Sequence, residues 1–293
     1  MTPCQDFEEF FRRVRTGGQS ATTADSCPTT TGTVFSPALF IFELKRVRGT
    51  FALLDLCSAP AVLRRWRESL LSFSNGMPAR VRQLVSGHDD SGRPLEAPHL
   101  AYLPLAAVGD QRADGRLVGL AAALPAALGE EDRGQLLRLL DCVRQLKLGP
   151  LGVWNLSRQA GDGCPENLRP EAWTAHPEGS THWSTITPVA FDRHPKQRQR
   201  SGCLRQEEEM VAAGCTAIGL PRPRAVVLTA VSAHLGVPPA HDFPRLRRKD
   251  GGERRHAHAI LVFDEPVCGP LLVGAGRYRG YGVCRPVNAE AWL

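Results

Sequence analysis

The order of the apolar segments between residues 38 and 156 constrains this chain most. Short runs of branched and aromatic residues predict strands, and apolar residues at spacings of three and four predict helices. Ser58 is expected to cap the first helix and Gly76 to end it. The expected elements are a strand at 38–45, a helix at 58–75, strands at 80–85, 99–105 and 117–124, a helix at 130–146 and a strand at 152–156. The segment at 80–85 could be a strand, and 117–124 either continues the strand at 99–105 or pairs with it. We interpret the elements as the strand–helix–strand–strand–helix–strand order of the ferredoxin-like fold.

The second half of the chain repeats part of this order. Strands are expected at 183–191, 225–232 and 257–263, and a helix with acidic residues at its start at 206–215. The last stretch, 269–286, is too short and glycine-rich for a further helix and strand. We therefore predict an α+β protein with two tandem ferredoxin-like domains, the second irregular and ending in a glycine-rich loop. The expected division is a flexible tail or linker at 1–33, a domain at 34–158, a junction at 159–180 and a domain at 181–293.

Composition excludes several classes of protein. Apolar residues make up 42% of the chain, which is enough for a buried core. No apolar stretch reaches the roughly 18 residues of a membrane span, and no secretory signal is visible, so we expect a cytoplasmic protein. The nine cysteines never form a Cys-x-x-Cys pair, which argues against a disulfide framework and a structural zinc site. The net charge of +6 allows a nucleic-acid partner without requiring one.

The most informative motif is the glycine-rich loop at 274–282, Gly-Ala-Gly-Arg-Tyr-Arg-Gly-Tyr-Gly. It fails as a dinucleotide fingerprint because Arg279 stands at the third glycine position. Its glycines permit close approach of a ligand, its arginines suit phosphates, and its tyrosines suit stacking on unpaired bases. The residues expected to bind RNA here are Gly274, Gly276, Arg277, Tyr278, Arg279, Gly280 and Tyr281. The alternative is a tight exposed turn.

Two basic runs in the second half, at 193–200 and 245–255, extend the RNA-binding hypothesis. A charge run is often only a solvated loop. Because the glycine-rich loop lies in the same half, we interpret these runs as RNA contacts. The residues assigned to this role are Arg198, Arg200, Arg254 and Arg255.

Two histidines, His88 and His99, flank a turn-forming segment. Histidine can take and give a proton near neutral pH, so both are candidate catalytic residues, although each could be structural. We prefer His99 because a strand beginning there would hold its ring more rigidly than the loop from His88 to Gly92. His-Asp at 88–89 is only a weak sign of a metal phosphohydrolase.

His256 and His258 lie two positions apart on an expected strand, so they should face the same side. No acidic third ligand stands at a helpful spacing. We therefore expect a packed or RNA-facing role for this pair, with no metal and no cofactor.

Several separated motifs resemble a known family in the same order. They are Ser-Gly-His-Asp at 86–89, Pro-His-Leu-Ala-Tyr-Leu-Pro-Leu at 98–105, Ala-Asp-Gly-Arg-Leu-Val-Gly at 113–119, Thr-Ile-Thr-Pro at 185–188, Pro-Val-Cys-Gly-Pro at 266–270 and the glycine-rich loop. Together they resemble the CRISPR repeat-RNA endoribonucleases of the sixth Cas family, in the RAMP superfamily. The likeness covers about residues 34–290 and is strongest to the version fused to a fifth-Cas-family subunit in subtype I-U (I-G) systems. A fusion would carry a further domain in front, so the chain resembles its nuclease portion.

The resemblance implies tandem ferredoxin-like folds and a glycine-rich loop that touches repeat RNA. It also implies metal-independent cleavage by the RNA's own 2′-hydroxyl, with His99 or His88 as the histidine in a matching motif. The expected partners are precursor and mature CRISPR RNA and other surveillance-complex subunits, among them the fifth-Cas-type backbone subunit. Two alternatives stay open: a non-catalytic RNA-binding subunit of the same complex, and a general RNA-binding module with structural histidines.

Overall fold

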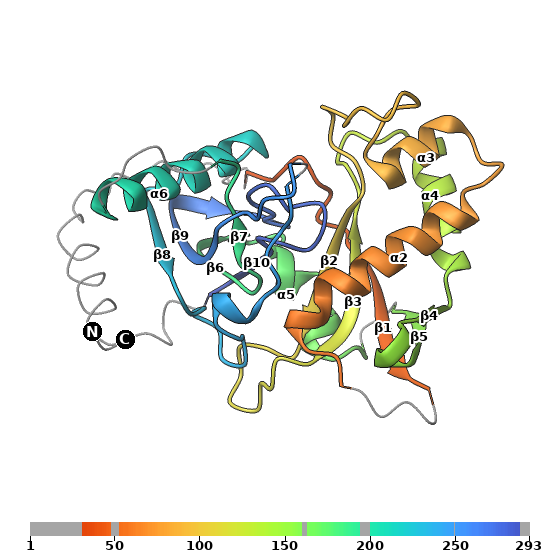
Figure 1. The fold of residues 1–293 in the computed structure, drawn as a ribbon, viewed down its shortest axis with the longest axis horizontal. Coiled ribbons are helices and arrows are strands. Elements are labelled where there is room, and N and C mark those ends of the chain that lie inside the picture. The colour runs from red at the N-terminus through yellow and green to blue at the C-terminus, as the bar shows by residue number, and fades with distance from the viewer. Residues whose placement is uncertain (1–30, 48–52, 160–162, 194–199, 249, 288–293) are drawn as a thin grey trace.

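The computed structural model describes residues 31–47, 53–159, 163–193, 200–248 and 250–287. Within them the chain forms two antiparallel sheets, one in each half, with helices packed against them (Figure 1). The α+β class predicted from the sequence is confirmed. No helix in the described part combines the length and the apolar character needed to cross a membrane.

The first sheet has five strands in the order β2-β3-β1-β5-β4, and every neighbouring pair is antiparallel. This order leaves β2 at one edge of the sheet. The strands are β1 (Phe40–Arg46), β2 (Ala101–Ala106), β3 (Leu117–Ala123), β4 (Gln145–Lys147) and β5 (Val153–Arg158). The helices are α2 (Ala59–Phe73), α3 (Ala79–Ser86) and α4 (Glu130–Cys142), with short 3-10 turns at Leu56–Ser58 and Gly149–Leu151. The strand β4 was not expected from the sequence.

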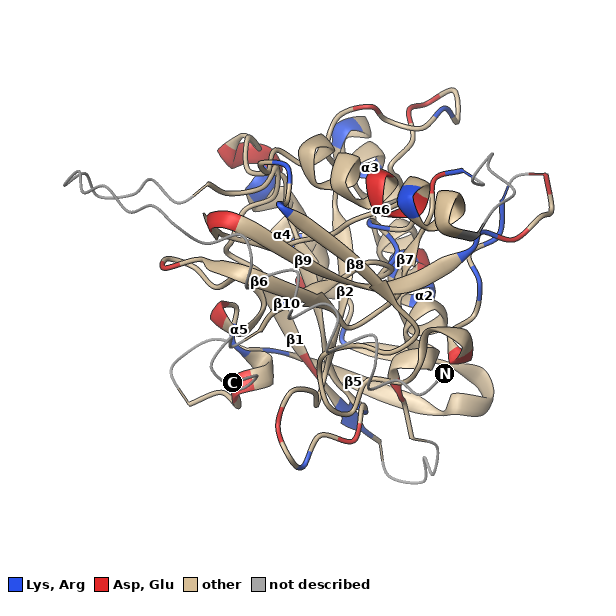
Figure 2. Cartoon of the chain, turned by 90° about the vertical axis from the view of Figure 1, so that its left-hand side faces the viewer, with Lys and Arg blue, Asp and Glu red and all other residues tan. Residues whose placement is uncertain are grey.

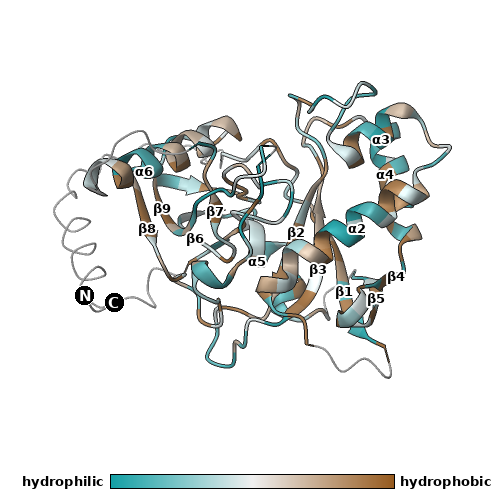
Figure 3. Cartoon of the chain, viewed as in Figure 1, coloured by the Kyte–Doolittle hydropathy of each residue, from teal (hydrophilic) through white to brown (hydrophobic). Residues whose placement is uncertain are grey.

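Helix α2 covers one face of the first sheet through Trp66. The indole is fully buried and meets the rings of Phe42 and Tyr102 edge to face, with centroid separations of 5.6 and 5.5 Å. Such aromatic pairs add about 0.5–1.5 kcal/mol each beyond the area they bury. Apolar residues recur along α2 at helical spacing, so the helix mixes polar and apolar colours in Figure 3 while β8 is mostly apolar.

Two local predictions for the first half were wrong. Residues 80–85 form helix α3 and not a strand, because Val81, Leu84 and Val85 are buried at helical spacing and Gly87 ends the helix in the left-handed region. Ser58 does not cap α2 with its side chain. Its backbone N–H and its hydroxyl both donate to the Asp55 carboxylate, each at 2.8 Å.

The second sheet has the order β10-β6-β9-β7, and β8 pairs with the long strand β9. Its elements are β6 (Ser180–Thr185), β7 (Val189–Ala190), α6 (Arg200–Ala217), β8 (Ala225–Thr229), β9 (His256–Val267) and β10 (Cys284–Pro286). The junction contributes a 3-10 turn at Glu166–Leu168 and α5 (Glu171–Thr174), and a further turn spans Ala240–Asp242. In Figure 2 the strands are mostly free of charged residues, whereas blue and red positions are interspersed on helices and loops.

Two predictions for the second half are corrected. The strand expected at 183–191 is split into β6 and β7. Helix α6 starts at Arg200, six residues earlier than expected, so Glu207 to Glu209 lie within it and not in its first turn. No helix is described between residues 269 and 286, as the glycine content of that stretch predicted.

Candidate functional site

The loop from Ser86 to Arg93 is tightly structured. The carboxylate of Asp89 accepts hydrogen bonds from the backbone N–H groups of Ser91 and Arg93, both at 2.9 Å, and from the Ser91 hydroxyl at 2.6 Å. Nδ1 of His88 lies 2.8 Å from the Ser86 carbonyl oxygen, so this nitrogen holds the proton and donates it. The sequence-based expectation that this loop is loose was therefore wrong.

His99 lies two residues before β2 and not at its first residue. Its half-buried ring stacks on Tyr278, with centroids 3.6 Å apart and planes inclined by 19°. Nδ1 lies 3.4 Å from the Ala97 carbonyl oxygen, which favours the tautomer with the proton on Nδ1 and a lone pair on Nε2. Gly87 leaves room for this ring, since a Cβ there would come within 2.4 Å of Nε2.

The imidazole of His99 is neutral at pH 7. Burial lowers its pKa from 6.5 to about 4, and the positive charges of Arg277 and Arg67 act in the same direction. A neutral imidazole can accept a proton from a substrate hydroxyl. The sequence predicted both His99 and Tyr278 as site residues, but not that Tyr278, from the other half of the chain, stacks on the His99 ring.

Arg277 of the glycine-rich loop and Arg67 of α2 lie near this histidine, and Arg279 of the same loop lies near Arg67. Arg277 places its guanidinium 5.0 Å from the Tyr278 ring centroid, and its Nε is buried without a hydrogen-bond partner among the described residues. Arg67 of α2 donates to the Ser86 carbonyl oxygen at 2.5 Å. Part of the Arg279 side chain is exposed, while the partial burial of its guanidinium, together with the nearby charge of Arg67, lowers its pKa.

None of Arg67, Arg277 and Arg279 has a carboxylate partner in the described part of the chain. Like charges gathered without a counter-ion repel one another, so the arrangement is suited to an anion that spans them. Phosphate is the anion that guanidinium groups bind best in two-pronged geometry. We call His88, His99, Tyr278 and these three arginines the histidine–arginine cluster.

Sequence reasoning missed Arg67. A usable signal was present, because Arg64 and Arg65 each have an acidic partner, Glu68, at helical spacing. Arg67 has no acidic residue three or four positions away on either side. An arginine left without such a partner on a helix is a better candidate for an anion contact than its paired neighbours.

The glycine-rich loop turns its residues in different directions. The ring of Tyr281 is buried and its hydroxyl donates to the Pro244 carbonyl oxygen at 2.6 Å, so its predicted stacking face is not on the surface. Tyr278 lies against His99 and also meets Phe35 edge to face, at 5.8 Å. Gly274 and Gly280 have positive φ angles of 84° and 79°, which only glycine adopts without strain. A Cβ at Gly280 would also lie 2.2 Å from Leu63 Cδ1 of α2.

The predicted basic runs do not join the histidine–arginine cluster through any contact among the described residues. Arg254 donates to the carbonyl oxygens of Phe191, at 2.9 Å, and of Asp192. Arg255 pairs with the buried carboxylate of Glu207 at 3.1 Å. Arg198 lies outside the described residues, and Arg200 is described only as the first residue of α6. Their assignment to RNA stays a prediction.

His258 has a packing role. Its ring is fully buried, with Nδ1 3.0 Å from the Thr185 hydroxyl and Nε2 3.0 Å from the Pro238 carbonyl oxygen. His256 is half-buried beside it on β9. Within the described residues, no group of three His, Cys, Asp or Glu side chains is placed to hold a metal ion.

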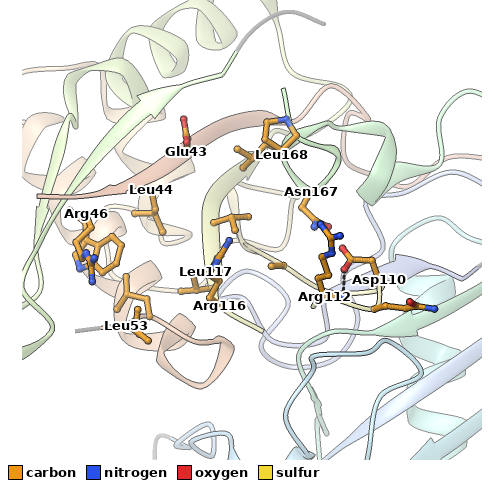
Figure 4. A pocket seen from close by; sticks show the side chains of 16 residues that line it. Glu43, Leu44, Arg46, Leu53, Asp110, Arg112, Arg116, Leu117, Asn167 and Leu168 are labelled. Atoms are coloured by element: carbon orange, nitrogen blue, oxygen red, sulfur yellow. Dashed lines mark hydrogen bonds between the residues drawn. The ribbon is translucent and has the colours of Figure 1, made fainter. Parts of the chain in front are cut away.

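A cavity of about 870 Å³ lies against β1, β3 and the junction (Figure 4). Leucines form much of its wall, and Arg46, Arg112 and Arg116 are among its polar lining residues. It contains none of the predicted site residues. The chemistry proposed below therefore does not depend on it.

Comparisons with known proteins give the following likenesses. A family model described as CRISPR-associated protein, GSU0054 family, matches residues 64–286. A solved structure titled "Characterization of a Cas6-related gene from Pyrococcus furiosus" is 9% identical, with a TM-score of 0.39 and coverage of 86% of this chain and 98% of that one. The structure of "Csf5, CRISPR-Cas type IV Cas6 crRNA endonuclease" is 14% identical, with a TM-score of 0.36 and coverage of 85% and 99%. No curated protein matches the chain.

Proposed function

Because the chain belongs to the GSU0054 family of CRISPR-associated proteins, we propose that it is an endoribonuclease that cuts precursor CRISPR RNA within the repeat. The observation that carries the proposal is the histidine–arginine cluster. It combines a neutral imidazole, His99, with three guanidinium groups that lack a carboxylate partner among the described residues. RNA supplies both the phosphate for those arginines and a 2′-hydroxyl for the imidazole.

The proposed reaction needs no metal ion. Nε2 of His99 takes the proton of the 2′-hydroxyl, whose oxygen then forms a bond to the adjacent phosphorus. The bond from phosphorus to the 5′-oxygen breaks, and that oxygen receives a proton from Nε2 of a doubly protonated His88, whose Nδ1–H keeps its hydrogen bond to the Ser86 carbonyl oxygen. The products are a 2′,3′-cyclic phosphate and a 5′-hydroxyl. Arg67, Arg277 and Arg279 stabilise the charge that builds on the phosphate oxygens.

The remaining parts of the proposal come from the resemblance seen in the sequence. We propose tandem ferredoxin-like halves, a cytoplasmic location, and a protein that stays with the mature guide in a surveillance complex beside a fifth-Cas-type subunit of a subtype I-U system. The strand order of the first sheet, with β1 between β3 and β5, supports the fold assignment.

A second candidate function is RNA binding without cleavage, in the same complex. One observation favours it: Tyr278 covers one face of the His99 ring, and Nε2 lies close to Gly87. A substrate hydroxyl must therefore reach Nε2 from the remaining open side, or Tyr278 must move.

The experiment incubates the protein with end-labelled repeat RNA from its own CRISPR array in EDTA. A parallel reaction uses RNA with a single 2′-deoxy substitution at the cut site. The proposal expects cutting in EDTA, a cyclic phosphate end, and no cutting of the deoxy RNA. Activity that is lost in EDTA and restored by magnesium would overturn the metal-independent reaction. Tight binding without cutting would establish the second candidate.

A further inference from the structure

The end of the glycine-rich loop and the residues that follow it contact the first half at two points, on the edge strand β2 and just beyond its end. Arg279 forms a parallel bridge with Tyr102, and Arg285 donates through Nη1 to the Val108 carbonyl oxygen. The two contacts are six positions apart in both parts of the chain, from Arg279 to Arg285 and from Tyr102 to Val108. Residues 279–285 thus have one backbone contact and one side-chain contact with the first half, and the histidine–arginine cluster lies at the first of them.

Arg285 forms the second contact. Its side chain is only 9% exposed, although it carries a charge. Besides Val108, its guanidinium donates to the Ala172 carbonyl oxygen at 3.3 Å and to the Glu166 carboxylate at 2.8 Å, both in the junction. Its own carbonyl oxygen lies 3.2 Å from Nε2 of His234 in the second half. Arg285, which belongs to the second half, therefore connects that half to the first half and the junction through its side chain, which the planar fork of arginine allows and lysine does not.

The segment around Arg285 has little freedom to move. Val283 bridges to Leu272, and the buried side chains of both residues belong to the apolar core of the first half. Gly109, next to Val108, has a φ of 92°, and a Cβ there would come within 2.6 Å of Nη1 of Arg285. Nη1 of Arg285 therefore fits closely against Val108 and Gly109, which leave no room for a Cβ at position 109.

We propose that Arg285 is a positioning residue, which fixes the glycine-rich loop against β2 and thereby places Tyr278 and Arg277 beside His99. Its effect on cutting rests on the proposed function, whereas its effect on the surroundings of His99 does not. A displacement of about 1 Å at a site of this kind can lower a rate about 10²-fold.

The test uses two variants, one that replaces Arg285 and one that changes a residue in contact with its guanidinium. Arg285→Lys keeps the charge but loses the fork. Gly109→Ala introduces a methyl group against Nη1. The control is Gly92→Ala, since Gly92 has a similar φ of 79° but nothing within 4 Å of its would-be Cβ. Glu166→Gln is a milder change of the same contact, available if the stronger variants do not fold.

Two quantities are measured for each variant. The first is the pKa of His99 from an NMR titration, with its resonance assigned by comparison with His99→Gln. The second is the single-turnover cutting rate at saturating protein, together with the Kd for repeat RNA. Circular dichroism confirms that each variant is folded.

The proposal expects the pKa of His99 to rise from about 4 toward its ordinary value of 6.5 as the stack loosens. The cutting rate should fall about 10- to 100-fold while Kd changes less than about threefold. Glu166→Gln should shift both quantities in the same directions by smaller amounts, and Gly92→Ala should change neither. An unchanged pKa of His99 in the folded variants would overturn the proposal and leave Arg285 a purely structural residue. If the wild-type protein does not cut, the proposed function fails, and the titration still decides this inference.

Discussion

His99 and His258 share a pKa that burial lowers to about 4, yet their surroundings differ. At His258, in the second half, both ring nitrogens have partners inside the protein, Thr185 and Pro238. At His99, only Nδ1 has a hydrogen-bond partner among the described residues, and the guanidinium groups of Arg277 and Arg67 lie nearby. A lowered pKa therefore does not distinguish a catalytic histidine from a packed one. What distinguishes a catalytic histidine is a ring nitrogen that is open to a substrate, together with nearby positive charges that lack a carboxylate partner among the described residues.

The largest expected effect separates the two histidines by activity. His99→Ala should lower the cutting rate about 10²- to 10⁴-fold, because a positioned acid or base contributes that much, and should change RNA affinity only a few fold. His258→Ala should instead lower the free energy of unfolding by about 2–4 kcal/mol, because it removes two buried hydrogen bonds and leaves a cavity. Single-turnover kinetics and urea unfolding of both variants check this. Should His88→Ala stop cutting while His99→Ala does not, the catalytic assignment moves to His88. If neither change slows cutting, this loop is not the active site.

The next effect concerns the space that Gly87 leaves for His99. Gly87→Ala should lower the cutting rate about 10- to 100-fold, because the new methyl group displaces the imidazole. Gly92→Ala is the matched control in the same loop: its φ of 79° carries a similar strain, but its Cβ meets nothing. Both substitutions should cost about 1 kcal/mol of stability through the positive φ alone. Equal rates for the two variants would show that the position of His99 does not matter for cutting.

A smaller effect tests the arginines. Replacing Arg67, Arg277 and Arg279 together by alanine should reduce the slope of log affinity against log salt by about two, since each phosphate contact on single-stranded nucleic acid contributes about 0.7. Arg64→Ala is the control, because Arg64 lies on the same helix and is exposed beside Glu68. Affinity is measured by filter binding over a range of salt concentrations. A slope like that of the wild type would mean that the cluster does not bind phosphate.

The smallest expected effect tests the lowered pKa that His99 and His258 have in common. The pKa values of His99, His234 and His258 are each lowered to about 4 in the folded protein, so the unfolded chain binds more protons between pH 4 and 6.5. Their contribution to stability is therefore present above pH 6.5 and is lost as the pH falls toward 4. Each histidine adds at most about 1.4 kcal/mol per pH unit to the slope of unfolding free energy against pH. His258→Gln should flatten that slope, measured by urea unfolding at several pH values. An unchanged slope would show that His258 is not held neutral by the fold.

Local pattern was enough to predict much of this molecule. The strands near 38–45 and 117–124 and the helix that begins at Glu130 follow from apolar runs and spacing, although that helix ends at Cys142 and the last part of the expected range 130–146 forms β4. His99 and the glycine-rich loop were identifiable as motifs. Residues 80–85 were misassigned because their few apolar positions suit either a short strand or a short helix. The burial of Tyr281 was not predictable, since the Pro244 carbonyl that accepts its hydrogen bond is distant in the chain.

The cluster itself lay beyond local reasoning. Arg67 belongs to a helix that precedes the histidine loop, and Tyr278 comes from the far end of the chain. Their meeting with His99 depends on how the glycine-rich loop packs against α2 and β2, which no spacing within either segment encodes. For Arg67, the trace in the sequence is that no acidic residue stands three or four positions away on the helix.

The bridge between Arg279 and Tyr102 and the hydrogen bond from the Arg285 side chain to Val108 couple the lengths of two distant parts of the chain. Tyr102 to Val108 and Arg279 to Arg285 span equal numbers of residues between shared contacts. An insertion or deletion of a single residue in one segment would let only one of the two contacts form, unless the other segment changed by the same amount. Natural variation in length among relatives should therefore fall outside both intervals, or occur in both together.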